Sequence, residues 1–253
     1  MARVLVPLPD RDFDVTEVSV PWKLLTEAGH DVVFATEKGE RAAADPRLLT
    51  GVIFGKLGAE PEAKAFYGEL EQAPRFARPL AWSDADPAEY GALLLPGGHA
   101  PGMRQYLEGE TLFARVAAFA KSGRPLAAIC HGVLVMARAR DGAGMSVLAG
   151  RRTTCLTKAM ERSAWILTAW KLGRYYRTYP EYVEDEVKRA LDDPDDQFEH
   201  GPRGLGAMLR KGTMDDDGPA FVVEDGSYLS ARWPGDAYLL AKKLIGRLAV
   251  GAA

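Results

Sequence analysis

The first half of the chain alternates short apolar runs with longer segments whose apolar residues recur at helical spacing. A short apolar run between turn residues is typical of a buried strand, and recurrence every three or four residues is typical of an amphipathic helix. In the stretch 15–28, Val18, Trp22 and Leu25 share one helical face, and Gly29 ends the pattern. The pattern predicts strands at 3–8, 31–35, 92–95 and 125–129, and helices at 15–28, 60–70, 111–122 and from the end of the fourth strand to about 140.

Strands that alternate with helices form crossover units, so the pattern predicts an α/β fold with a doubly wound, mostly parallel sheet flanked by helices. The second half is less regular and is predicted to hold a strand at 151–156, helices at 158–173 and 181–191, a hairpin at 221–230 and a last helix from Pro234 to about 250. We found no convincing linker. We therefore expect one domain over residues 1–253, with a helical and acidic insertion at about 158–219.

Two predicted strands end in loops with unusual residues, Pro96-Gly97-Gly98-His99 and Cys130-His131-Gly132. The carboxyl ends of parallel strands meet at one sheet edge, where ligands of α/β proteins bind. Cys130 has a small residue two positions before it and another two positions after it, which is the pattern of a nucleophile on a sharp strand-to-helix turn. The alternative is a small, buried and inert cysteine. The neighbouring motif favours a reactive Cys130.

A reactive cysteine must ionise more easily than a free thiol, whose pKa is about 8.5. Lowering that pKa by about 3 units requires about 4 kcal/mol of differential stabilisation. The helix start after Cys130 favours the thiolate but supplies less than about 2 kcal/mol. We therefore expect a thiolate at position 130 together with a further stabilising partner.

The composition excludes several classes of function. The formal charge of −3 and the pI of about 5.9 argue against a nucleic-acid partner, and no apolar stretch approaches the length of a membrane span. Aromatic and basic residues between 165 and 182 resemble a base-stacking surface, but a packed cap or a dimer contact is favoured. Two cysteines and the lack of a signal peptide indicate a cytoplasmic location. No His/Cys cluster or spaced acidic loop predicts a metal, and no cofactor is expected.

The residues 93–98, Leu-Leu-Leu-Pro-Gly-Gly, followed by 127–132, Ala-Ala-Ile-Cys-His-Gly, resemble the ThiJ/PfpI superfamily of class I glutamine amidotransferase-like proteins. The stretches 17–21 and 29–32 are similar to the first helix of that family and its end. The resemblance covers residues 1 to about 156, and the closing hairpin and helix match more loosely. It implies a flavodoxin-like fold, a possible homodimer, and kinship with heat-shock chaperones that have glyoxalase III activity.

The resemblance also implies roles for individual residues. Glu17 would contact the Cys130 thiol through a protonated carboxyl. The alternative is that it caps or decorates the first helical turn; the resemblance favours the contact with the thiol. His131 would act as general acid and base. Its backbone N–H and that of Gly98, in the Gly97-Gly98 loop, would form an oxyanion hole.

Two further side chains each have two alternative expected positions. His99 is expected either at the pocket rim, in contact with substrate, or in solvent. Glu161 is expected to orient His131, or else to point outward from a helix; a neighbouring subunit could also complete the site.

The leading hypothesis is an enzyme that acts covalently through Cys130 on a small carbonyl compound, with glyoxalase III-like conversion of methylglyoxal to lactate as the reference reaction. An amidase, peptidase or glutamine amidotransferase is one alternative, because the same turn serves amide hydrolysis. A stress chaperone, or a redox sensor in which Cys130 is oxidised, is the other.

Overall fold

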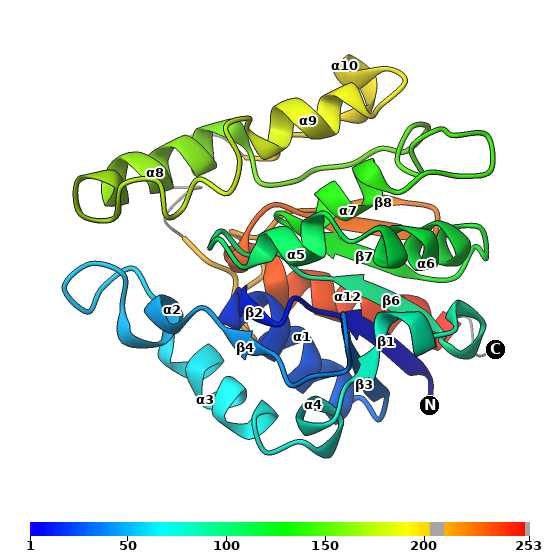
Figure 1. The fold of residues 1–253 in the computed structure, drawn as a ribbon, viewed down its shortest axis with the longest axis horizontal. Coiled ribbons are helices and arrows are strands. Elements are labelled where there is room, and N and C mark those ends of the chain that lie inside the picture. Colours follow the sequence, from blue (N-terminus) through cyan, green and yellow to red (C-terminus); the bar gives the residue numbers. More distant parts are fainter. Residues whose placement is uncertain (203–209, 251–253) are drawn as a thin grey trace.

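The computed structural model describes residues 1–202 and 210–250. Its main sheet has seven strands in the order β5-β3-β1-β6-β7-β9-β8, and every neighbouring pair is parallel except β8 and β9 (Figure 1). A second sheet pairs β2 with β4. The strands are β1 Arg3–Pro7, β2 Arg11–Phe13, β3 Asp31–Thr36, β4 Ala43–Ala44, β5 Leu80–Ala81, β6 Ala92–Leu95, β7 Leu126–Ile129, β8 Val222–Asp225 and β9 Tyr228–Ala231.

Helices cover the sheet, so the predicted fold class is confirmed. Helices α1 and α12 pack against each other and against the sheet, whereas α5, α6 and α7 form a separate group that α9 covers (Figure 1). The α-helices are α1 Val15–Glu27, α2 Pro46–Thr50, α3 Pro61–Leu70, α4 Pro74–Ala77, α5 Met103–Leu107, α6 Glu110–Ala120, α7 Gly132–Arg138, α8 Lys158–Leu172, α9 Val183–Arg189, α10 Pro194–Gln197 and α12 Ala237–Val250. Short 3₁₀ turns are η1 Trp82–Asp84, η2 Pro87–Glu89 and η3 Pro234–Asp236.

The strand order reverses next to β1. The chain moves from β1 to β3 and β5 on one side, and from β6 to β7 and β9 on the other. This reversal leaves a crevice at the carboxyl ends of β1 and β6, where α/β sheets bind ligands. The four strands predicted in the first half are all present, and their side chains are almost wholly buried.

The strand predicted at 151–156 is wrong. Thr153 forms only an isolated bridge with Phe198, and the backbone N–H of Thr154 donates to the hydroxyl of Ser230, a residue of β9. Both edges of β9 are already paired, with β7 and with β8. The segment, Arg-Arg-Thr-Thr-Cys-Leu, therefore passes beside β9 without pairing with it. Cys155, which lies on it, is buried as expected.

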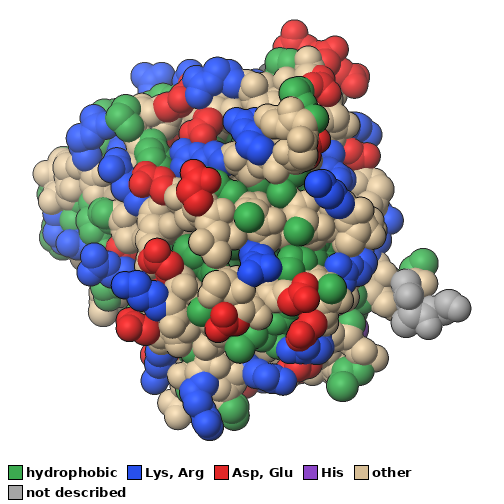
Figure 2. Space-filling view, turned by 45° about the vertical axis from the view of Figure 1, so that its right-hand side comes forward, with side chains coloured by type: hydrophobic (Ala, Val, Ile, Leu, Met, Phe, Trp, Pro, Cys, Tyr) green, Lys and Arg blue, Asp and Glu red, His purple; other side chains and the backbone are tan. Residues whose placement is uncertain are grey.

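The segment after this crossing forms a separate layer. Helices α8, α9 and α10 lie above the ends of the sheet (Figure 1), within the range where an insertion is predicted; its residues 203–209 lie outside the described part. Basic and acidic side chains are interspersed on the face drawn in Figure 2. Over residues 1–202 and 210–250, no helix combines the length and apolar character that a bilayer crossing requires.

Candidate active site

Cys130 occupies a strained turn between β7 and α7. Its φ of +58° lies in the left-handed region, which residues other than glycine rarely adopt. The turn is sharp because α7 starts against the end of β6: a Cβ added to Gly132 would lie 2.1 Å from the carbonyl oxygen of Leu95. The predicted strand-to-helix turn at Cys130 is therefore confirmed.

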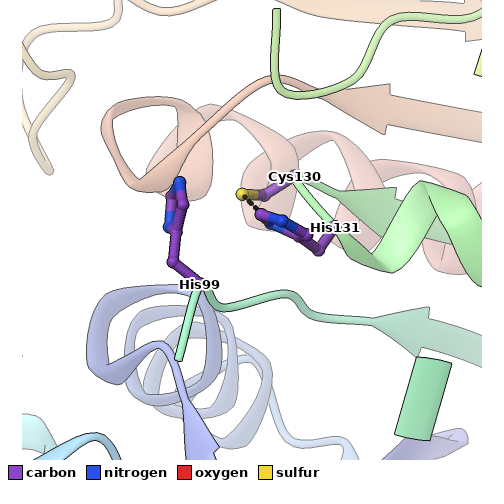
Figure 3. A group of neighbouring side chains, drawn as sticks. All are labelled: His99, Cys130 and His131. Atoms are coloured by element: carbon purple, nitrogen blue, oxygen red, sulfur yellow. Dashed lines mark hydrogen bonds between the residues drawn. The ribbon is translucent and has the colours of Figure 1, made fainter. Parts of the chain in front are cut away.

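His131 lies beside the sulfur. Its Nδ1 is 3.5 Å from Sγ of Cys130 (Figure 3), and its Nε2 is 3.5 Å from Oγ1 of Thr178. The Thr178 hydroxyl in turn donates to the carbonyl oxygen of His99 over 2.7 Å. Four residues from three separate segments thus form one polar chain.

This chain determines which histidine nitrogen carries the proton. A threonine hydroxyl has one hydrogen, and the His99 carbonyl accepts it, so Thr178 can only accept from His131. Nε2 of His131 is therefore the donor, and Nδ1 presents its lone pair to the Cys130 thiol. In this tautomer His131 is ready to receive the proton of the sulfur.

Glu17 is completely buried on α1. Its Oε2 accepts the backbone N–H of Gly97 over 2.7 Å, and Oε1 has no hydrogen-bond partner among the described residues. Burial raises the pKa of Glu17 well above its usual range, and the neighbouring Asp14 carboxyl raises it further. Burial thus favours the neutral form of Glu17, which lies close enough to Cys130 for each group to affect the pKa of the other.

Burial acts on the reactive pair as well. It raises the pKa of the Cys130 thiol, and the Glu17 carboxyl adds to this effect, while the backbone N–H of His131 opposes it. Burial also lowers the pKa of His131 well below 6.5. The expected resting thiolate is therefore not supported, because desolvation outweighs the helix start. Burial thus favours a neutral thiol next to a neutral imidazole.

The Gly97-Gly98-His99 loop follows β6 and faces the turn. A Cβ on Gly97 would lie 2.7 Å from the backbone nitrogen of His131, so only glycine permits this approach. The His99 ring lies 4.8 Å from the His131 ring, centroid to centroid, and burial lowers its pKa to about 4. Of the two expected places for His99, the structure supports the one next to the site.

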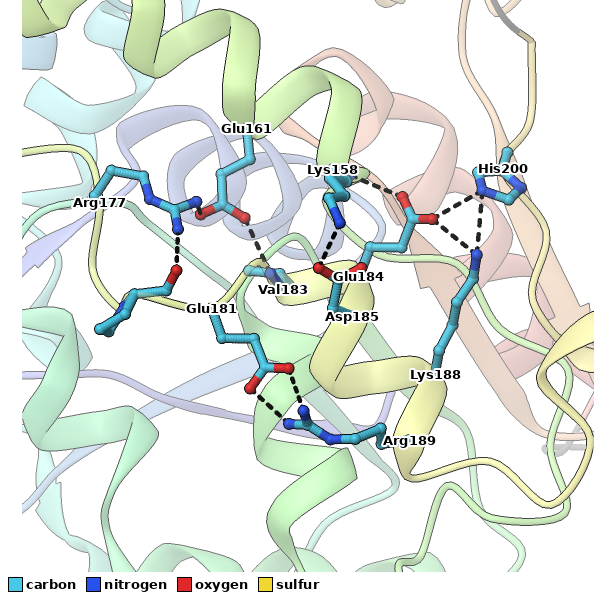
Figure 4. Close-up of polar contacts among 11 residues, drawn as sticks. Lys158, Glu161, Arg177, Glu181, Val183, Glu184, Asp185, Lys188, Arg189 and His200 are labelled. Carbon is cyan, nitrogen blue, oxygen red and sulfur yellow. Dashed lines mark hydrogen bonds and ion pairs between the residues drawn. The ribbon is translucent and has the colours of Figure 1, made fainter.

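Glu161 does not orient His131 (Figure 4). It is buried, but its carboxylate accepts from Arg177 over 2.8 Å and from the backbone of Val183 over 3.0 Å. Burial raises its pKa to about 7 against the opposing effect of these two donors. Glu161 therefore connects α8 with the 174–180 segment and with α9. The position beside His131 that was predicted for Glu161 is occupied by Thr178.

The 174–180 segment covers the site. Arg104 donates two hydrogen bonds, of 3.0 and 2.7 Å, to the carbonyl of Thr178, and the Tyr176 hydroxyl donates to Asp45 over 2.9 Å. With the segment in this position, Cys130 is 0% exposed and His131 is 1% exposed. The sulfur is therefore closed to a substrate in this conformation.

Two residues of this site were missed by the sequence analysis. Asp14 caps α1 by accepting from the backbone of Thr16 and Glu17, and burial raises its pKa to about 6. Its position three residues before Glu17 follows the spacing of a capping box, so a pattern was available. Thr178 had no such signal, because its role depends on the tertiary position of the cover.

The arrangement of turn, acid and Gly-Gly loop agrees with one family. A sequence model described as "ThiJ/PfpI family-like" matches residues 8–202. The chain belongs to the ThiJ/PfpI family. Among ThiJ/PfpI relatives, a deglycase of Pyrococcus abyssi is 26% identical over 243 residues, covering 96% of this chain and 97% of that protein. Protein/nucleic acid deglycase 2 of Escherichia coli is 28% identical over 157 residues, covering 62% of this chain and 72% of that protein.

Solved structures of the ThiJ/PfpI fold agree with the chain over nearly its whole length. Glyoxalase III of Candida albicans superposes with a TM-score of 0.69 at 19% identity, covering 97% of this chain and 96% of that one. At this identity the likeness shows the fold alone. The relatives named as deglycases indicate that the family includes enzymes.

Proposed function

We propose that this protein is a cysteine-dependent enzyme that acts covalently on a small carbonyl compound, a 2-oxoaldehyde or its adduct with a thiol or amine. The observation that carries the proposal is the contact between Cys130 Sγ and His131 Nδ1 in a single tautomer. A nucleophile paired with an oriented base is the signature of covalent catalysis. The names of the deglycase and glyoxalase III relatives support the substrate class.

The first step uses the neutral pair. Sγ of Cys130 attacks the aldehyde carbon as its proton moves to Nδ1 of His131, and the carbonyl electron pair moves to oxygen. The backbone N–H groups of Gly98 and His131 hold this oxygen, which the approach of the Gly97 backbone to the His131 nitrogen supports. Protonation of the oxygen by His131 gives a hemithioacetal and restores the base.

The next step moves a proton between adjacent carbons. His131 removes the hydrogen from the former aldehyde carbon and delivers it as a proton to the ketone oxygen, giving an enediol. It then takes the proton of the hydroxyl on the former aldehyde carbon and returns it to the neighbouring carbon. Methylglyoxal becomes a lactoyl thioester of Cys130 in this way, without net oxidation. Water then cleaves the carbon–sulfur bond, so methylglyoxal and one water give lactate and the free thiol.

The protonated, neutral form of Glu17 has a role in the last step of the reaction. A neutral carboxyl can donate a hydrogen bond to the sulfur when it leaves as a thiolate in the last step. A charged carboxylate would repel that thiolate in the same place. The pKa of Glu17, raised by burial, thus keeps the acid in its useful form.

The test compares substrates and two cysteine variants. Wild type, Cys130→Ala and Cys155→Ala are each assayed with methylglyoxal, with the hemithioacetal of methylglyoxal and N-acetylcysteine, with glutamine and with short peptides. Cys155 is the matched control, because it is equally buried. We expect lactate from the first two substrates with wild type and Cys155→Ala, and none with Cys130→Ala.

Two results contradict the proposal. Lactate production that survives in Cys130→Ala rules out the covalent step. Cys130-dependent release of ammonia or of cleaved peptide, without lactate, assigns the same site to amide hydrolysis.

A further inference from the structure

The fold brings together three side chains that the sequence keeps apart, and all three are of types that bind zinc. His99 follows β6, Cys130 follows β7 and His131 precedes α7. One ligand atom from each lies within 4.8 Å of the others. Figure 3 shows the His99 ring on one side of the sulfur and the His131 ring on the other.

Two of the three atoms already have the spacing that a metal requires. A tetrahedral zinc ion, with Zn–S of about 2.3 Å and Zn–N of about 2.0–2.1 Å, holds sulfur and nitrogen about 3.6 Å apart. The separation between Sγ of Cys130 and Nδ1 of His131 is 3.5 Å. These two ligands could bind the ion without rearrangement.

His99 completes the set with a small movement. Two nitrogens on one tetrahedral zinc lie about 3.4 Å apart, and the three ligand atoms lie within 4.8 Å of one another, so its ring must approach by at most about 1.4 Å. Its Nε2 is buried and has no hydrogen-bond partner among the described residues. The ring is therefore not held by another contact of that nitrogen, and its lone pair is available.

The surroundings of His131 also suit a ligand. Metal-binding histidines almost always donate the second ring N–H to a neighbouring acceptor, which fixes the tautomer. Nε2 of His131 does this with Thr178, so Nδ1 faces the sulfur with its lone pair. Three protein ligands would leave the fourth position for water or a substrate oxygen.

We propose that His99, Cys130 and His131 bind a zinc-type divalent cation, and that the bound ion blocks turnover. The metal–sulfur bond replaces the S–H bond, and the proton leaves to solvent. The ion then holds both the nucleophile and the base. Binding stands independently of the proposed function, whereas inhibition rests on it.

Cobalt(II) is the probe for binding, because its thiolate complexes absorb in the near ultraviolet and tetrahedral sites absorb strongly in the visible. Chelator-treated full-length protein is titrated with Co²⁺, and then with Zn²⁺ to displace it. We expect one Co²⁺ per wild-type chain, no thiolate band in Cys130→Ser, and an affinity lowered at least about tenfold in His99→Asn. Cys155→Ala and His30→Ala, which change a cysteine and a histidine outside the trio, should bind as wild type does.

The failures can be told apart. A wild-type spectrum without the thiolate band, or an unchanged affinity in His99→Asn, overturns the three-ligand site whatever the enzyme does. If Co²⁺ binds but Zn²⁺ at saturating concentration leaves lactate production unchanged, the inhibitory role is overturned. If Co²⁺ binds and no substrate is turned over, the proposed function fails while the metal site stands.

Discussion

Nε2 of His131 lies 3.5 Å from the hydroxyl oxygen of Thr178, a residue 47 positions further along the chain and outside the sheet. The Thr178 proton is committed to the His99 carbonyl, so this contact sets the histidine tautomer. The base next to Cys130 is thus oriented by the cover of the site. In many hydrolases a carboxylate orients the catalytic histidine. Here a threonine hydroxyl lies in the corresponding position beside His131.

Replacing Thr178 by valine keeps the shape and removes the acceptor. A hydrogen bond of this kind contributes about 0.5–1.5 kcal/mol, so we expect kcat to fall by about 2- to 13-fold with little change in KM. Thr178→Ser, which keeps the hydroxyl, should retain the wild-type kcat. Thr168→Val is the control, because that hydroxyl bonds only within its own helix. A wild-type kcat in Thr178→Val would show that the contact does not orient the base.

The rate should persist at unusually low pH. His131 accepts a proton only in its neutral form, and burial lowers its pKa well below 6.5. We therefore expect kcat/KM to stay level as the pH falls through 6.5 and to decline only further down. The measurement is kcat/KM for methylglyoxal between pH 4.5 and 8. A half-maximal value near pH 6.5 would indicate a histidine with ordinary solvation.

The buried acid on α1 should make stability depend on pH. The pKa of Glu17 is raised in the folded protein, so its contribution is complete below the unfolded value of about 4.3 and is lost as the pH rises toward the folded value. The free energy of unfolding should fall by about 1.4 kcal/mol per pH unit from this group alone. Glu17→Gln removes that slope.

Chemical unfolding at pH 5, 6, 7 and 8 measures the difference between wild type and Glu17→Gln. We expect the variant to gain stability relative to wild type at each higher pH. Glu69→Gln, at a side chain that is 52% exposed, is the matched control and should run parallel to wild type. Parallel curves for both variants would mean that Glu17 is ionised in the fold.

Two ion pairs in the covering layer should differ sharply in strength. In Glu161–Arg177 the side chains are 1% and 6% exposed, whereas in Glu181–Arg189 they are 35% and 64% exposed. Removing one partner of a buried pair leaves an uncompensated charge, so Glu161→Ala should cost about 3–5 kcal/mol of unfolding free energy. Glu181→Ala should cost less than about 1 kcal/mol. Equal losses in urea unfolding would contradict this assignment of the layer.

Local patterns predicted the part of the site that depends on neighbours in sequence. The turn at Cys130 needs only a buried strand, small flanking residues and Gly132, all of which the sequence displays. The position of Gly97 just after the carboxyl end of β6 was predictable in the same way. Both were predictable because strand and helix periodicity determine where they lie.

Contacts across the fold were not predictable in this way. Glu161 has the expected distance from Cys130 along the chain, but α8 carries it to Arg177. The run 151–156 was predicted to be a strand, yet both edges of β9, the strand that it contacts, are already paired with β7 and β8. The neutral state of Cys130 depends on complete burial, which no single segment reveals.

The position of Thr178 on the cover has a consequence for the base. The tautomer of His131 is fixed only while the Thr178 hydroxyl lies beside Nε2. If the 174–180 segment moved away, the imidazole would be free to turn or to exchange its tautomer with water. The orientation of the base and the closure of the site over the sulfur therefore depend on the same short segment.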